Sequence, residues 1–215
     1  MPTNLKHNPT GPRPRHSREA ITRIAVALAD AQGIGAVSIR GIAAQLGSGP
    51  ASLYRYVKSL DELIELMIDW ISAEYDFASC RGSATEQLLS ISRQGREIMR
   101  RHPWVPALVL QRQFFTPHAL SYLEQGLTAL ENSPISGSAK LHTLGMLNGI
   151  TAAFALNERS AKQPAKAEDL LQLLSAGAYP HLSQTLKEIS EPLDQEEAFD
   201  AAISNFLRGI LVRVN

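Results

Sequence analysis

Apolar residues recur every three or four positions along most of this chain, and this spacing constrains the fold more than any other feature. In the first such run, Ile21, Ile24, Ala25, Leu28 and Ala29 would form a single stripe along one helix. No segment shows the sustained alternation of polar and apolar residues that indicates a strand. Most prolines and glycines stand between the periodic runs, where they interrupt helices. We therefore predict an all-α fold without a sheet.

The residues that begin and end helices divide the chain further. Ser59, Ser83 and Asp194 each stand three residues before a glutamate, which is the capping-box pattern of a helix start. Thr116 and Pro117 suit an N-cap followed by a first-turn proline. A long helix is expected to start at about residue 60 and a last one at about residue 195. The other expected helices cover about residues 17–32, 39–46, 50–57, 84–102, 104–113, 117–131, 136–161 and 167–189.

The charges are distributed unevenly, although the formal net charge is zero. Residues 1–60 hold eight of the 21 Lys and Arg residues and two of the 21 acidic residues, which gives +6. Residues 61–215 hold the other thirteen bases and nineteen acids, which gives −6. A basic N-terminal region on an acidic body suggests that only this region meets a polyanion such as nucleic acid. Chance clustering of the charges is the simpler alternative.

Two short predicted helices joined by a glycine-containing turn suggest a helix-turn-helix. The first covers residues 39–46 with Ser38 as its N-cap, and Gly47-Ser48-Gly49 forms the turn. The second, residues 50–57, begins with a proline, whose missing N–H would be unpaired in a first helical turn anyway. A short helix with small or polar outer residues can enter the DNA major groove, which is about 12 Å wide. Helix hairpins with a glycine turn also occur in proteins that read no DNA, so the pattern alone leaves both interpretations open.

A longer stretch that contains this motif, VSIRGIAAQLGSGPASLYRYVKSLDELIELMID, resembles the N-terminal signature of the tetracycline-repressor (TetR) family. Its part LGSGPASLYRYVKSLDEL is similar to the turn, the recognition helix and the start of the next helix in that family. The resemblance covers about residues 17–70. Residues 102–211 more weakly resemble the C-terminal domain of the tetracycline repressors themselves, through HPWVPALV, PHALSYLEQGLTAL and FDAAISNFLRGIL.

The resemblance implies an all-helical homodimer whose first three helices bind DNA. It implies a helix-turn-helix domain at 17–60 and a larger helical effector-binding and dimerisation domain at 61–215. The polar composition and four prolines of residues 1–16 indicate a disordered basic arm before them. The expected function is that of a sequence-specific DNA-binding transcriptional regulator, a repressor released from its double-stranded operator by a small apolar or amphipathic effector. A ligand-independent architectural DNA-binding protein and an enzyme with an appended DNA-binding head are the alternatives.

Ten residues in and around the motif are expected to contact DNA. The Arg55 guanidinium can reach guanine or phosphate, and small apolar groups can touch a thymine methyl. In the family, residues that match Tyr54 and Lys58 usually contact phosphate. One of the two tyrosine rings is expected to be partly buried, because a tyrosine can pack its ring and still expose its hydroxyl. The predicted contacts are Ser38, Arg40, Ser48, Pro50, Ala51, Ser52, Tyr54, Arg55, Tyr56 and Lys58.

The larger domain is expected to hold an effector pocket and a dimer interface. Large apolar residues would line the pocket, and a few polar groups would orient the ligand; simple core packing is the alternative for each of them. The predicted pocket residues are Trp70, Met99, Trp104, Gln111, Phe115, His118, Met146, Asn148 and Phe154. Small residues let helices approach closely, and the expected helix 136–161 is rich in them. This helix and the last one are expected to pair with the same two helices of a second chain in a four-helix bundle, with intrachain packing as the alternative. Its predicted residues are Gly145, Gly149, Ala152, Ala153, Ile203, Phe206, Leu207 and Ile210.

The sequence offers no pattern for catalysis or for a bound cofactor. No nucleophile elbow, dinucleotide-binding or phosphate-binding glycine motif occurs, and the histidines lack metal-ligand spacing. We therefore expect no metal, no cofactor and no enzymatic activity. With Cys80 as the only cysteine and no apolar run of membrane-spanning length, a cytoplasmic protein without a membrane segment is expected.

Overall fold

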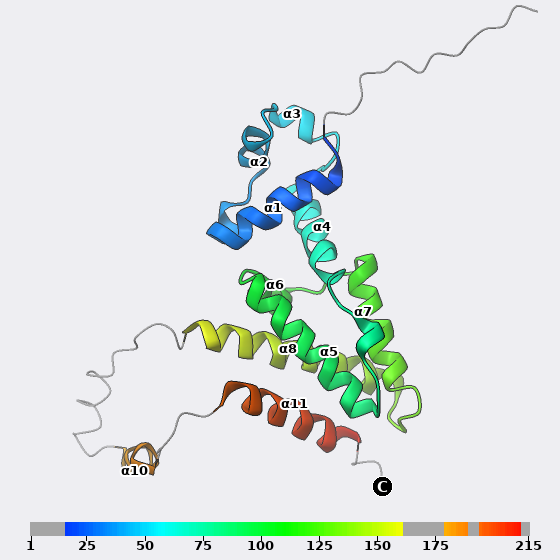
Figure 1. Ribbon diagram of the computed structural model, residues 1–215, viewed down its shortest axis with the longest axis vertical. Helices are drawn as coiled ribbons and strands as arrows, with labels where there is room; N and C mark the ends of the chain where they lie inside the picture. Colours follow the sequence, from blue (N-terminus) through cyan, green and yellow to red (C-terminus); the bar gives the residue numbers. More distant parts are fainter. Residues whose placement is uncertain (1–15, 161–178, 189–193, 212–215) are drawn as a thin grey trace, which may run out of the picture. The chain divides into compact units, whose positions relative to one another are not determined.

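The computed structural model describes residues 16–160, 179–188 and 194–211. These residues form helices and no strand (Figure 1), which confirms the all-α prediction. The predicted basic arm lies outside the described residues except for His16, as does the expected polar linker at 162–168. Of the helix expected over 167–189, the described part is α10, Pro180–Glu188.

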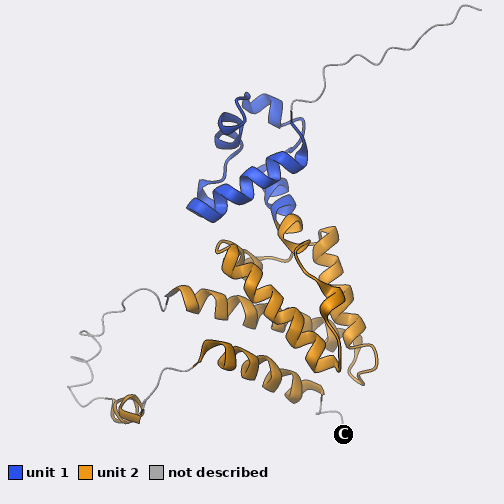
Figure 2. Cartoon of the chain, viewed as in Figure 1, with its two compact units in different colours: residues 1–67 blue, residues 68–215 orange. Residues whose placement is uncertain are grey.

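The chain divides into two compact units, residues 1–67 and 68–215 (Figure 2). The first unit contains α1 (Arg18–Gln32), the short 3₁₀ helix η1 (Ile34–Ala36), α2 (Ile39–Gln45), α3 (Pro50–Leu53) and the beginning of α4 (Leu60–Ser72). Leu63 and Met67 on α4 have no exposed surface. The N-terminal unit thus extends past residue 60, where the expected domain ended, to take in the first turns of α4.

Local capping residues explain where the first helices begin and end. The Ser17 hydroxyl accepts a hydrogen bond from the Ala20 backbone N–H at 3.0 Å and starts α1. Gly33 ends α1 with a positive φ of 84°, which a residue with a side chain rarely adopts. The inward stripe of α1 is buried as predicted except at Ile24, which is half-buried, and Ile21 and Ala25 are fully inaccessible to solvent.

The second unit is built around α5 (Ala84–Arg101), which packs against α7 (Pro117–Ala129), α8 (Gly137–Ser160) and α11 (Gln195–Leu211). The 3₁₀ helix η2 (Phe77–Ser79) precedes α5, and α6 (Val105–Gln111) packs against α8. The capping box at Ser83 is present with both of its reciprocal hydrogen bonds, so this predicted helix start is confirmed. The Asp194 carboxylate likewise accepts hydrogen bonds from the Glu196 and Glu197 backbone N–H groups and starts α11.

A buried arginine joins three helices of this unit. Arg96 on α5 is 1% exposed, and its Nε donates to Glu158 Oε1 on α8 at 2.6 Å. Its Nη1 donates to Glu196 Oε2 on α11 at 2.9 Å, and its guanidinium lies over the Phe199 ring at 4.6 Å. Arg100, one turn further on, donates to the same two carboxylates. Because the buried charge is paired and hydrogen-bonded, the cluster can fix the N-terminal end of α11 against α5 and α8.

Candidate nucleic-acid interface and ligand cavity

The helix-turn-helix forms as the sequence predicts, apart from its second helix. The Ser38 hydroxyl accepts a hydrogen bond from the Gly41 N–H at 3.1 Å and caps α2. Gly47 has a φ of 58°, and the chain then turns into Pro50, the first residue of α3. The regular helix ends at Leu53 rather than at the predicted Val57. Residues 54–56 continue as turns, and the Tyr56 and Val57 N–H groups both donate to the Leu53 carbonyl, at 2.8 and 3.0 Å.

This segment has one buried side and one accessible side. Leu53 and Val57 have no exposed surface and anchor it in the unit. None of the ten residues predicted to contact DNA is buried. Tyr54 is 53% exposed while Tyr56 is half-buried, so one ring is partly packed, as expected. The exposed members are Ser38, Arg40, Pro50, Ala51, Tyr54, Arg55 and Lys58, and the half-buried ones are Ser48, Ser52 and Tyr56.

We call residues 50–58, which include most of the residues predicted to contact DNA, the reading segment. Its end is hydrogen-bonded to the start of α4. The Lys58 backbone N–H donates to Glu62 Oε2 at 2.6 Å, and the Glu62 N–H donates to the Ser59 hydroxyl at 3.0 Å. The predicted capping box is therefore shifted, because the glutamate accepts from the residue before the N-cap. Glu62 also pairs with Arg18 on α1. These bonds hold the Lys58 backbone in place while its side chain remains exposed, which suits a phosphate contact.

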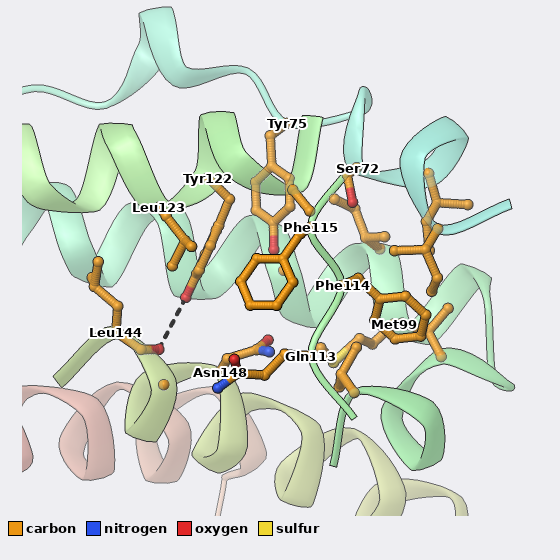
Figure 3. A pocket seen from close by; sticks show the side chains of 18 of the residues that line it. Ser72, Tyr75, Met99, Gln113, Phe114, Phe115, Tyr122, Leu123, Leu144 and Asn148 are labelled. Carbon is orange, nitrogen blue, oxygen red and sulfur yellow. Dashed lines mark hydrogen bonds between the residues drawn. The ribbon is translucent and has the colours of Figure 1, made fainter. Parts of the chain in front are cut away.

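The second unit encloses a cavity of about 430 Å³. Its walls are mostly apolar and aromatic, and a few polar groups converge on it, as in sites that bind small molecules (Figure 3). The last turns of α4 contribute Ile68, Ile71 and Ser72. The other lining residues are Tyr75, Gly95, Ile98, Met99, Val105, Val109, Arg112, Gln113, Phe114, Phe115, Ala119, Tyr122, Leu123, Leu141, Leu144, Gly145 and Asn148.

Three of the nine residues predicted for the pocket line this cavity: Met99, Phe115 and Asn148. Two others pack in the protein interior: Trp104 is buried with its ring edge toward His102, and Phe154 packs edge-on against Phe199. The remaining four, Trp70, Gln111, His118 and Met146, are exposed and do not line the cavity.

The exposed His118 pairs instead with a carboxylate on α4. Its backbone N–H donates to Asp69 Oδ1 at 2.8 Å, and its Nδ1 lies 3.0 Å from Asp69 Oδ2. Burial alone would raise the pKa of Asp69, but the contacts with His118 outweigh it and hold that pKa below its ordinary value. This pair joins the start of α7 to α4.

Two tyrosines of the cavity wall were absent from the sequence prediction. Tyr75 lies in the loop after α4, stacked on Phe77 with ring centroids 5.3 Å apart and planes at 8°. Tyr122 on α7 lies 5.6 Å from Tyr75, and its hydroxyl donates to the Leu144 carbonyl at 3.4 Å. Desolvation raises the pKa of both phenols well above the ordinary value, so both are neutral near pH 7. The isolated Gly95 within the predicted helix was the available signal, since such a glycine usually has a packing reason.

The residues predicted for the dimer interface separate into two groups. Ala152, Ile203 and Leu207 have no exposed surface, because their faces of α8 and α11 pack inside the same chain. For these three the intrachain alternative holds, and the interface prediction is corrected. Gly145 and Ala153 are exposed, and Gly149, Phe206 and Ile210 are half-buried.

The described part of the chain offers neither a metal cluster nor a membrane span. None of its His, Cys, Asp and Glu side chains gather in groups of three or more that could hold a metal ion. Within the same described ranges, no helix is long and apolar enough to cross a membrane.

Comparisons with known proteins agree with this architecture. The curated repressor DrrR1 of Streptomyces coeruleorubidus is 26% identical over 219 residues, which covers 95% of this chain and 80% of that protein. Crystal structures of the TetR family protein ActR of Streptomyces coelicolor share the fold. Its complex with (S)-DNPA has a TM-score of 0.78 at 23% identity over 93% of this chain and 99% of that chain. Its complex with actinorhodin has a TM-score of 0.76 at 24% identity over 92% and 97%.

Two protein-family models match the chain. Residues 21–67 match the bacterial regulatory proteins of the tetR family, and residues 79–214 match the tetracyclin repressor-like C-terminal domain. The second match alone spans more than half of the chain. Both the family and the relatives named above are transcriptional regulators rather than enzymes. The chain belongs to the TetR family of DNA-binding transcriptional regulators.

Proposed function

We propose that this protein is a repressor that leaves its operator when a small molecule enters the cavity of the second unit. The observation that carries the proposal is the cavity itself, about 430 Å³ with an apolar wall and converging polar groups. Relatives support it: DrrR1 is named a repressor, and ActR was crystallised with small molecules. Because a regulator must reach DNA, the proposal includes a cytoplasmic location.

The protein acts as a homodimer in this proposal, because one short reading segment spans too few base pairs to specify an operator. Two segments about 34–36 Å apart would read successive major grooves of a palindrome. The accessible faces of α8 and α11 are available for pairing, with small residues at Gly145, Gly149 and Ala153 and half-buried Phe206 and Ile210. Two such helices from each chain would form a four-helix bundle.

Helix α4 is the proposed link between ligand and DNA. Its first turns belong to the DNA-binding unit, and its last turns supply Ile68, Ile71 and Ser72 to the cavity wall. A ligand that contacts these residues can favour one position of the helix. To release DNA, the ligand must bind the DNA-free state more tightly than the DNA-bound state.

A mobility-shift assay on the DNA that flanks the protein's own gene tests the proposal. The full chain should retard that DNA and leave unrelated DNA of equal length unbound at the same salt concentration. Candidate ligands that bind the cavity should then release it. Equal affinity for all sequences, with only a steep salt dependence, would identify an architectural DNA-binding protein instead.

A further inference from the structure

Two tyrosine hydroxyl groups face the same cavity, and the described residues form a hydrogen bond with only one of them. The Tyr122 hydroxyl donates to the Leu144 carbonyl at 3.4 Å. Among the described residues, none forms a hydrogen bond with the Tyr75 hydroxyl, which is directed into the cavity (Figure 3). The Tyr75 hydroxyl therefore keeps its hydrogen-bonding capacity for a molecule that enters the cavity. Such a group is expected at a site where a ligand completes the bond.

The position of Tyr75 is fixed by its neighbours. A Cβ on Gly95 of α5 would lie 2.7 Å from the Tyr75 Oη, so the hydroxyl can occupy this place only beside a glycine. The stacking of the ring on Phe77 and its contact with Tyr122 set the plane of the phenol. A donor held in advance in this way loses little conformational freedom when it binds.

The rest of the wall defines the chemistry of a matching ligand. Among the described residues that line the cavity, Arg112 is the one charged residue and no acid is present. Phe114, Phe115 and the two tyrosines supply flat apolar surfaces. Such surfaces favour a planar aromatic ligand, because aromatic rings attract one another in stacked or edge-on arrangements.

We propose that Tyr75 is a specificity-determining residue that donates a hydrogen bond to a carbonyl oxygen on the edge of a planar aromatic effector. The proposal rests on the ligand-binding function proposed above and names the chemical class that the cavity selects. Tyr122 contributes an aromatic surface, because its hydroxyl is already engaged by Leu144.

A pair of rigid probes separates the carbonyl from the ring system. Fluorenone and fluorene share one flat tricyclic skeleton and differ only in a C=O group that replaces a CH₂ group. Fluorescence titration of the full chain without DNA should show that fluorenone binds about tenfold more tightly than fluorene, which is the contribution of one well-placed hydrogen bond. Tyr75→Phe should abolish the preference, and Tyr122→Phe, the matched control in the same cavity, should retain it.

Infrared spectroscopy gives a readout that a purely structural role of Tyr75 would not change. The carbonyl stretch of bound fluorenone should move to lower frequency in the wild-type protein and in Tyr122→Phe, and return to its apolar-solvent position in Tyr75→Phe. If Tyr75→Phe fails to fold, the wild-type spectrum still tests the proposal, because an unshifted carbonyl stretch would overturn it.

Several results would overturn the assignment. They are an unshifted carbonyl stretch in the wild type, equal binding of both probes, loss of the preference in Tyr122→Phe, or binding of neither probe. In each case the repressor function stands or falls separately, on the mobility-shift assay described above.

Discussion

At the scale of single residues, Arg55 and Tyr54 are the side chains of the reading segment that we propose to contact DNA, Arg55 at guanine or phosphate and Tyr54 at phosphate. Both are exposed, and among the described residues the Arg55 guanidinium donates a hydrogen bond only to the Ser52 hydroxyl, at 3.4 Å. Arg55→Ala should therefore weaken operator binding by about 1–3 kcal/mol, and Tyr54→Phe by less, because it removes a single phosphate contact. Thermal unfolding should not change. A mobility-shift assay measures the loss of affinity, with Arg208→Ala, at an exposed residue of α11, as the control. If Arg55→Ala and Tyr54→Phe both bound the operator as the wild type does, this face would not belong to the DNA interface.

Gly95 supports a second prediction at this scale. Gly95→Ala would place a methyl group 2.7 Å from the Tyr75 hydroxyl and force the ring out of position. We expect fluorenone affinity to fall about tenfold, the value of the lost hydrogen bond, while DNA affinity without ligand is kept. Gly209→Ala on α11 is the control, because its new methyl group would meet no atom within 4 Å. A variant that binds fluorenone as tightly as the wild type would show that Tyr75 can move without loss.

At the scale of helices, the Arg96 cluster decides whether α11 stays attached to α5 and α8. Arg96→Ala removes the buried guanidinium that bridges Glu158 and Glu196, leaves Glu158 with Arg100 alone, and should lower the free energy of unfolding by about 3 kcal/mol. Arg93→Ala, also on α5, breaks an ion pair with Asp200 on α11, but the Arg93 side chain is 54% exposed. Its effect should stay below about 1 kcal/mol. Urea unfolding of both variants makes the comparison, and equal losses would contradict a special role for the buried cluster.

The same cluster predicts a dependence of stability on pH. Burial alone would raise the pKa of Glu158, but hydrogen bonds from Arg100 and Arg96 hold it below its ordinary value. A carboxylate with a lowered pKa in the folded state stabilises the protein above its unfolded pKa, about 4.3, and this stability is lost as the pH falls through the folded value. Urea unfolding should give a lower free energy of unfolding below pH 4 than at pH 7. Glu158→Gln should be less stable at pH 7 and show a shallower decline on acidification.

At the scale of the whole molecule, the proposed function requires two copies of the chain. Ala153 is exposed on the α8 face proposed for pairing. Ala153→Glu should bring like charges together across the two-fold axis, produce a folded monomer and abolish tight operator binding. Light scattering during size-exclusion chromatography measures the mass. Leu120→Glu on α7 is the matched control, because Leu120 is also exposed but lies outside the proposed interface; a dimeric Ala153→Glu protein would exclude this face.

Local patterns predicted much of the fold because they depend on neighbours in sequence. The starts at Ser17, Ser38, Ser83 and Asp194 are correct, since a capping hydroxyl or carboxylate bonds to backbone N–H groups two or three residues away. The early end of the regular helix at Leu53 could not be predicted in this way, because no glycine or proline follows it and the change appears only in the shared Leu53 carbonyl, which accepts from both Tyr56 and Val57.

The sequence by itself determined most helix starts and the exposed side of the reading segment, because these follow from spacings of a few residues. It indicated the family through the resemblance of residues 17–70 to a known signature. Only the tertiary structure decided which residues line the cavity and which faces of α8 and α11 stay accessible. Tyr75 and Gly95 are twenty positions apart, and no local spacing indicates that a hydroxyl fits where a side chain is missing. The packing of α5 and α7 around that loop brings the two tyrosines together, and the cavity is the space that this packing leaves unfilled.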